Sequence, residues 1–254
     1  MTTNGTGELA GRVALVTGGV RRIGRAIGLD LARRGATVVV NTRSSRAEAE
    51  ETVRAIEAVG GTARAMLADV TDEAAVARMV DAIAHDFGTV DILINNAADR
   101  REAPFTEITL ADWHAITRVV LDGAFLCSRA VIPGMVAKGR GTIINIGGVT
   151  GHAGATHRAH VVTAKAGLVG LTKALAVEFG GVGITVNCVV PGRIGGNRSV
   201  SSGQGGAIPG GGLPLVGRDG TVEEVSAAVM LLCGPAGGYI TGQTIHITGG
   251  IYLP

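Results

Sequence analysis

Short hydrophobic runs rich in β-branched residues alternate with longer segments of helical periodicity along almost the whole chain. Such alternation is typical of βαβ units, which build a parallel sheet. Runs such as VALV and TVVV are nearly uninterrupted, as expected of strands that helices cover on both faces. The pattern predicts seven strands, at Arg12–Thr17, Thr37–Asn41, Arg64–Ala68, Val90–Asn95, Thr142–Ile146, Ile184–Val189 and Thr244–Thr248.

Helical periodicity fills the intervals, at 22–34, 44–59, 71–87, 109–137, 156–180 and 221–233. No Pro- or Ser-rich linker and no repeat divides the chain, so residues 1–254 are predicted to form a single α/β domain. The exception to this regularity is residues 195–217, whose first eighteen positions include eight glycines. Such a segment is expected to be either a flexible lid over the substrate or poorly ordered.

Composition narrows the class of protein. With 46% hydrophobic and 17% charged residues, the 254-residue chain can bury a sizeable core. A net charge of +2 gives no footprint for nucleic acid, so a small-molecule ligand is favoured. The spacing of the three cysteines suits neither a disulfide framework nor a zinc site, and no metal site is predicted. We expect a cytoplasmic protein without a membrane segment, because no apolar signal core and no run near 18 apolar residues stands out.

A glycine-rich turn, TGGVRRIG at residues 17–24, follows the first strand and opens directly into a helix. In this setting, glycines let the backbone approach a pyrophosphate, and the free N–H groups at the helix N-terminus bind the anion. The sequence therefore predicts a nucleotide site.

Further motifs follow in order: Asp69 after the third strand, NNAA at 95–98, INIGG at 144–148, a helix with Lys165, PGRI at 191–194 and TGQTIHITGG at 241–250. With the turn, they resemble the short-chain dehydrogenase/reductase family, especially its bacterial members similar to 3-oxoacyl-acyl-carrier-protein reductase. The resemblance spans essentially the whole chain. It implies a Rossmann-like doubly wound sheet in the order 3-2-1-4-5-6-7 with helices on both faces. It also implies a homotetramer with helices 109–137 and 156–180 at the interfaces.

The resemblance also implies which residues bind the dinucleotide. Thr17, Gly18, Ile23 and Gly24 would hold the pyrophosphate region, Asp69 and Val70 the adenine, and Asn96 and Ala97 the ribose side. Ile194, in the motif with Pro191 and Gly192, would meet the nicotinamide amide, and Lys165 would hold the nicotinamide ribose.

Basic residues surround the expected ribose 2′ position. Arg22 replaces the family's middle glycine, and with Arg21 it opposes the helix dipole unless an anion binds. The second strand ends in Asn41, Thr42 and Arg43, where an NAD enzyme has a carboxylate for the 2′-hydroxyl. Guanidinium groups suit a 2′-phosphate, so NADP(H) is predicted over NAD(H).

The catalytic positions depart from the family pattern. Its chemistry uses an Asn-Ser-Tyr-Lys set, of which this chain keeps only Lys165. The equivalents of the other three are Val120, Gly148 and Val161. Shifting the register cannot restore the phenol, because the two tyrosines, Tyr239 and Tyr252, lie in the last sixteen residues.

The pocket is therefore expected to be apolar, with Lys165 as its one ionisable group and burial disfavouring its ammonium form. A histidine could replace the missing proton donor. His157 lies eight residues before Lys165, and shares its face if the helix already runs there.

Three functions remain open. The first is an NADP(H)-dependent reductase of a carbonyl-like small molecule that uses a rearranged acid, His157 or water. The second is a catalytically silent NADP(H)-binding subunit. The third is non-redox lyase, isomerase or cyclase chemistry on the same scaffold.

Overall fold

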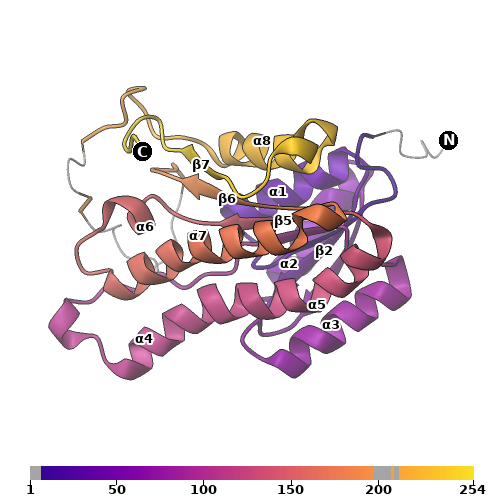
Figure 1. Ribbon diagram of the computed structural model, residues 1–254, viewed down its shortest axis with the longest axis horizontal. Helices are drawn as coiled ribbons and strands as arrows, with labels where there is room; N and C mark the ends of the chain where they lie inside the picture. Colours follow the sequence, from indigo (N-terminus) through magenta and orange to yellow (C-terminus); the bar gives the residue numbers. More distant parts are fainter. Residues whose placement is uncertain (1–6, 197–206, 209–211) are drawn as a thin grey trace.

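A seven-stranded parallel sheet forms the centre of the computed structural model, which describes residues 7–196, 207–208 and 212–254. Its order is β3-β2-β1-β4-β5-β6-β7, so the doubly wound Rossmann-like prediction is confirmed (Figure 1). The strands are β1 (Val13–Val16), β2 (Thr37–Thr42), β3 (Thr62–Leu67), β4 (Ile92–Asn95), β5 (Gly141–Ile146), β6 (Ile184–Pro191) and β7 (Thr244–Ile247). Each lies within about two residues of its predicted bounds.

Helices cover both faces of the sheet, as their apolar stripes require. The helices are α1 (Arg22–Arg33), α2 (Arg46–Ala58), α3 (Glu73–Phe87), α4 (Leu110–Thr117), α5 (Gly123–Lys138), α6 (Thr150–Ala153), α7 (Ala159–Phe179) and α8 (Val222–Cys233). One core cluster packs α1, α2 and α8 against the sheet, and another packs α3, α5 and α7 against the opposite face (Figure 1). The three cysteines are buried in these layers with free thiols.

Two predicted helices are interrupted. The stretch predicted at 109–137 consists of α4, a π-helical turn over Arg118–Asp122 and α5. The stretch predicted at 156–180 begins only at Ala159, and α6 precedes it as a separate turn. The delay has a local cause, since the backbone of His157 takes a left-handed conformation, with φ 58°, that a right-handed helix excludes.

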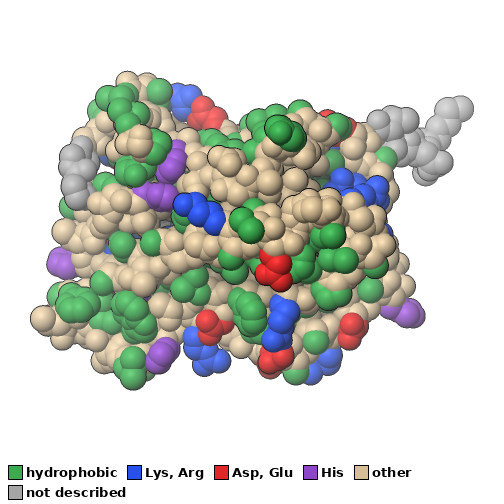
Figure 2. All heavy atoms as spheres, viewed as in Figure 1, with side chains coloured by type: hydrophobic (Ala, Val, Ile, Leu, Met, Phe, Trp, Pro, Cys, Tyr) green, Lys and Arg blue, Asp and Glu red, His purple; other side chains and the backbone are tan. Residues whose placement is uncertain are grey.

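Two helical stretches of the described chain, Leu110–Lys138 and Ala159–Val182, are long and apolar enough to cross a membrane by length and composition. Polar residues interrupt both stretches, so they pass on mean hydropathy over an 18-residue window and not as an uninterrupted apolar run. The test is weak here, because core helices of soluble proteins also pass it, and 44% and 39% of the two windows are buried. Figure 2 shows apolar side chains on the face where α4, α5 and α7 lie. The exposed hydrophobic residues of these helices include Leu110, Phe125 and Val177.

Most of the predicted lid at 195–217 lies outside the described residues. Among those described, Pro214, Leu215 and Val216 pack around Gly249 and Gly250, where an added Cβ would approach them to 2.8–3.0 Å.

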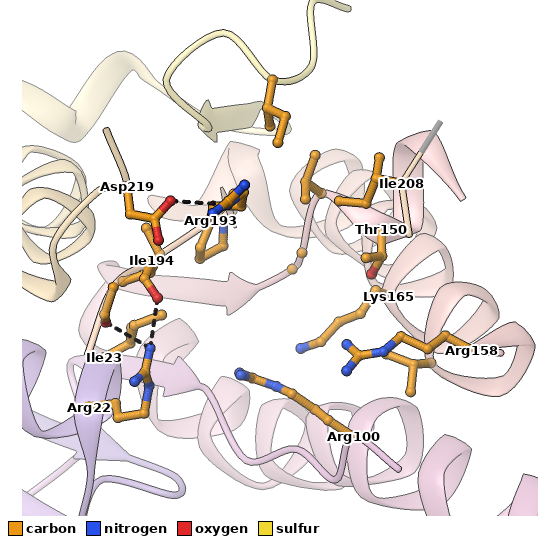
Figure 3. A pocket seen from close by; sticks show the side chains of 18 of the residues that line it. Arg22, Ile23, Arg100, Thr150, Arg158, Lys165, Arg193, Ile194, Ile208 and Asp219 are labelled. Carbon is orange, nitrogen blue, oxygen red and sulfur yellow. Dashed lines mark hydrogen bonds and ion pairs between the residues drawn. The ribbon is translucent and has the colours of Figure 1, made fainter. Parts of the chain in front are cut away.

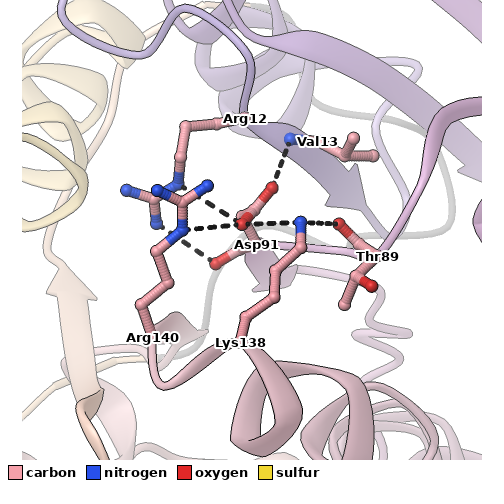
Figure 4. Close-up of polar contacts among 6 residues, drawn as sticks. All are labelled: Arg12, Val13, Thr89, Asp91, Lys138 and Arg140. Carbon is pink, nitrogen blue, oxygen red and sulfur yellow. Dashed lines mark hydrogen bonds and ion pairs between the residues drawn. The ribbon is translucent and has the colours of Figure 1, made fainter.

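A buried carboxylate joins the amino ends of three strands. Asp91, fully buried just before β4, accepts a hydrogen bond from the backbone N–H of Val13 in β1 at 3.0 Å. Its other oxygen accepts hydrogen bonds from Lys138 Nζ and Arg140 Nε, both at 3.2 Å, and lies 3.9 Å from Arg12 Nε (Figure 4). One charge thus connects β1 and β4 to the turn that leads from α5 into β5.

We predict that Asp91→Asn lowers the free energy of unfolding by about 3 kcal/mol, because removing one partner of a buried ionic cluster leaves the others uncompensated. The matched control is Asp122→Asn, which breaks an exposed i,i+4 pair with Arg118 and should change stability little. Urea denaturation of both variants measures the difference. Equal midpoints for the two variants would contradict a structural role for the cluster.

Candidate functional site

A pocket of about 580 Å³ opens at the carboxyl edge of the sheet (Figure 3). It lies where ligands bind in doubly wound α/β folds. Gly147 and Gly148 enter it directly after β5, Pro191 at the end of β6, and Lys165 from α7. The lining residues are Arg22, Ile23, Arg100, Gly147, Gly148, Val149, Thr150, Arg158, Val161, Lys165, Pro191, Gly192, Arg193, Ile194, Gly195, Gly196, Ala207, Ile208, Asp219 and Ile251.

The glycine-rich turn is held against β4 by side-chain hydrogen bonds. Thr17 Oγ1 accepts from the backbone N–H groups of Asn96 and Ala97, at 3.0 and 3.1 Å. Asn96 Nδ2 in turn donates to the carbonyls of Thr17 and Gly18, at 3.0 and 2.9 Å. A Cβ on Gly24 would come within 2.6 Å of that amide, and Gly18 has φ 59°, so glycine is required at both positions.

Arg22 replaces a glycine and keeps a glycine-like backbone, with φ 47°. Such a conformation is strained for a long side chain. Its Nη2 donates to the carbonyls of Ile194 and Gly195, at 3.0 and 3.1 Å, and so links the turn to the loop after β6 (Figure 3). Arg21 instead pairs with Glu48 on α2. The two arginines therefore have protein partners at the helix N-terminus.

The residues predicted to bind the adenine and the ribose 2′ group lie at the ends of β2 and β3 or directly after them. Arg43 is exposed directly after β2. Asn41 is buried, and its amide donates to the carbonyls of Met66 and Ala68, so this side chain holds the edge of the sheet. Asp69 accepts two hydrogen bonds from Thr71, at 2.9 Å from the backbone N–H and 2.8 Å from the hydroxyl, and shapes the turn after β3. Val70 is buried beside it.

Three of the four catalytic positions meet at the pocket. Lys165 and Val161 are one turn apart on α7, both nearly buried, and Gly148 faces Lys165. A Cβ on Gly148 would lie 3.8 Å from Lys165 Cγ, an ordinary contact, so the serine of the family pattern would fit. Val120 lies in the π-helical turn and lines a separate cavity of about 10 Å³.

The amine of Lys165 is buried, with 4% of the residue exposed, and donates to the Ile146 carbonyl at 2.6 Å. The pKa of Lys165 is lowered to about 7, first by burial and then by the positive charge of Arg100, while Cys188 opposes the shift. The expectation that burial disfavours the ammonium form agrees with this direction.

His157 is not placed as its predicted role requires. It is exposed, lies outside α7 and does not line the pocket, because its left-handed backbone precedes the helix. Its carbonyl accepts a hydrogen bond from the backbone N–H of Ala103. The condition under which His157 would share a helix face with Lys165 is therefore not met, because α7 begins at Ala159.

The expectation of an apolar pocket with one ionisable group is also wrong. Arg22, Arg100, Arg158, Arg193 and Asp219 line it together with Lys165. Arg100 and Arg158 can be named from the sequence as candidates to meet an anionic group, but the four arginines come from the glycine-rich turn and three loops, and only the folded chain shows that they line the pocket. The sequence did indicate a charged pocket in one way: Arg22, Arg100 and Arg193 lie within or close to the motifs that surround the site.

Comparison with known proteins agrees with this geometry. Residues 18–252 match the family profile described as Enoyl-(Acyl carrier protein) reductase. The chain belongs to the short-chain dehydrogenase/reductase family, which confirms the resemblance seen in the motifs.

Among curated relatives it is similar to the 3-oxoacyl-(acyl-carrier-protein) reductase FabG of Escherichia coli, at 39% identity over 96% of this chain and 98% of the relative. It is also similar to FabG of Vibrio cholerae, at 37% identity over 97% of this chain and 99% of the relative. The 3-oxoacyl-(acyl-carrier-protein) reductase of Synechocystis is 38% identical, over 96% of this chain and 98% of the relative.

The lowered pKa of Lys165 can be measured directly, because the chain has only three lysines, Lys138, Lys165 and Lys173. We predict one lysine ¹³Cε resonance that titrates near pH 7, with the ammonium below this pH and the free amine above it. Lys165→Met should remove this titration and Lys173→Met should leave it. A wild-type protein without a lysine titration between pH 6 and 8 would contradict the assignment.

Proposed function

We propose that this protein is an NADP(H)-dependent reductase that reduces a carbonyl group of a small molecule, with Lys165 delivering the proton. The observation that carries the proposal is the position of Lys165 in the pocket wall, beside Gly148 and one helical turn after Val161. The relatives' names describe reductases of a carbonyl carried on acyl-carrier protein, which supports the reaction type.

The residues of the turn fit a dinucleotide. Gly18 and Gly24 leave a cradle that a Cβ would fill, and α1 begins without a side-chain cap or an acidic residue in its first turn. Its N-terminus therefore offers N–H groups and a positive dipole end to a pyrophosphate. Lys165, Ile194 and the Asn96–Ala97 backbone would hold the nicotinamide end. When bound, NADPH supplies the hydride for the reduction.

The preference for NADP(H) over NAD(H) rests on the charge near the end of β2. Arg43 is exposed there, and Asn41 turns its amide onto backbone carbonyls. Neither side chain offers a carboxylate to a ribose 2′-hydroxyl, whereas the guanidinium of Arg43 suits a 2′-phosphate.

Lys165 takes over the proton transfer for which the family uses tyrosine. Reduction of a carbonyl builds negative charge on its oxygen, which needs a proton donor within hydrogen-bond reach. The neighbouring family positions, Gly148 and Val161, carry no such group. His157 is exposed and does not line the pocket, so it does not reach a substrate there. An amine with a pKa of about 7 is half protonated at neutral pH, as efficient general acid catalysis requires.

The loss of the tyrosine and serine also favours a second candidate, a catalytically silent NADP(H)-binding subunit. In that case Lys165 would only hold the nicotinamide ribose. A cytoplasmic location and a homotetramer are part of the proposal in either case. The exposed Leu110, Phe125 and Val177 on α4, α5 and α7 support the homotetramer, because subunit contacts would bury them.

The test is turnover at saturating NADPH, after cofactor binding has been measured by nicotinamide fluorescence. We predict that Lys165→Met lowers kcat/KM at least about 100-fold, the usual contribution of a general acid. Lys173→Met, an exposed lysine on the same helix, should keep wild-type turnover. In the wild type, log kcat/KM should fall with unit slope above about pH 7, because the free enzyme then loses the ammonium form. A flat profile, or full turnover in Lys165→Met, would rule out this proton donor.

A double variant separates an active enzyme from a silent subunit. Gly148→Ser/Val161→Tyr restores the two missing side chains, and the space beside Gly148 accepts the serine. If Lys165 is the proton donor, wild type is active and the double variant changes its pH profile, because a phenol then shares the proton transfer. Turnover only in the double variant would instead favour the silent subunit.

A further inference from the structure

The basic residues on the α7 side of the pocket are not accounted for by the cofactor or by proton transfer. We propose that Arg100 and Arg158 form a subsite for a carboxylate of the substrate beside Lys165, so that the enzyme acts on small oxo acids. This substrate class rests on the proposed carbonyl reduction, but the subsite itself is a binding site that can be tested without turnover.

Arg158 is the fixed member of the subsite. It is the residue before α7, and its side chain is only 7% exposed. Its Nε and Nη2 both donate to one carboxylate oxygen of Glu102, at 2.8 and 2.5 Å. Two donors on one acceptor hold the guanidinium plane at the pocket wall.

Arg100 approaches the same place from the loop after β4. Its backbone N–H donates to Asp99 Oδ1 at 2.7 Å, which shapes this loop. Figure 3 shows its guanidinium extending toward the end of the Lys165 side chain, with the Arg158 guanidinium on the same side. The positive charge of Arg100 contributes to the lowered pKa of Lys165, so the two groups interact electrostatically.

Three basic side chains reach this end of the pocket. Arg100, Arg158 and Lys165 all line it, while the carboxylate of Glu102 pairs with Arg158 and that of Asp99 accepts from the Arg100 backbone N–H. Like charges in a partly buried pocket repel each other, and an anion bound among them would remove this cost. A carboxylate matches guanidinium geometry and forms charge-assisted hydrogen bonds with it.

The two other arginines of the lining, Arg22 and Arg193, are assigned to a different role from Arg100 and Arg158. Arg22 lies at the glycine-rich turn, where the cofactor phosphates belong, and Arg193 pairs with Asp219 at 3.0 Å. Figure 3 shows both across the cavity from Arg158, with the Arg100 guanidinium between Arg22 and the end of Lys165. Val149, Val161, Ile208 and Ile251 supply apolar side chains to the lining, beside the hydroxyl of Thr150. This arrangement suits a short alkyl chain with a carboxylate at one end.

The test uses binding of oxo acids and of their uncharged amides to the NADP⁺-saturated protein, measured by calorimetry. The probes are pyruvate, acetoacetate and 4-oxopentanoate, which carry the carboxylate at three distances from the carbonyl. We expect at least one acid to bind about tenfold or more tightly than its amide, the effect of one charge-assisted hydrogen bond. Arg100→Gln should reduce that preference to about threefold or less.

Arg101→Gln is the matched control, because the adjacent Arg101 pairs with Asp99 and Asp112 and does not line the pocket. It should keep the full preference for the acid. Arg100→Lys, which keeps the charge without the fork of donors, should keep part of it. NADP⁺ affinity should be the same in wild type and Arg100→Gln.

Three results would overturn the subsite. They are no preference for any of the three acids, a preference that survives in Arg100→Gln, and a loss of NADP⁺ affinity in Arg100→Gln that exceeds the loss of acid affinity. The last would assign Arg100 to a cofactor phosphate. An acid preference without NADPH oxidation would keep the subsite and refute the reductase, whereas reduction of neutral ketones without an acid preference would do the reverse.

Discussion

The pairing of β1 with β4 is the constraint on which the rest of the structure depends, and polar groups fix it at both ends. At the amino edge, the buried carboxylate of Asp91 accepts from the backbone of Val13 while cations neutralise its charge. At the carboxyl edge, the hydroxyl of Thr17 accepts from the first backbone N–H groups after β4, and Asn96 returns two hydrogen bonds to the turn. Because a parallel pair has no hairpin to set its register, such contacts determine how far each strand extends. They place the glycine-rich turn beside the loop that carries Arg100, and the pocket forms between the two.

The second constraint is a buried amine among guanidinium groups. In the family pattern a phenol would share this space, and its ionised form would offset the charge of the lysine. With Val161 at that position, the free energy of burying Lys165 depends on the Ile146 carbonyl and on what binds in the pocket. Proton binding and anion binding are then reciprocal: an oxo acid at Arg100 would raise the pKa of Lys165, and the protonated lysine would bind the acid more tightly. Substrate binding would thus bring the proton donor into its charged form.

The strands and the glycine-rich turn could be predicted because each depends on a local pattern, whereas Lys165 was placed by the resemblance to the family. β-branched runs mark buried strands, and glycines mark a close approach of backbone to ligand. The placement of His157 failed because helical periodicity does not reveal where a helix begins, and a left-handed residue with no glycine or proline beside it gives no warning. The prediction of an apolar pocket failed because the charge of the pocket depends on tertiary contacts. Arg158 turns inward to meet Glu102, a residue 56 positions earlier, and no sequence window contains both.

The positions that depart from the family pattern have different effects in the cofactor half and in the substrate half of the site. On the cofactor side, Arg22 keeps the backbone of the glycine that it replaces and extends its side chain to the carbonyls of the loop after β6. A residue held at φ 47° costs free energy, so the link to the loop must offset part of that strain. On the substrate side, Gly148 and Val161 remove two hydroxyls without collapsing the cavity, since a Cβ on Gly148 would still meet only ordinary contacts. The substitutions therefore leave the cavity open, while the cations of its lining come from other positions, Arg22, Arg100 and Arg158. With the proposed subsite, a cavity with this charge favours substrates that bring a negative charge to the lysine.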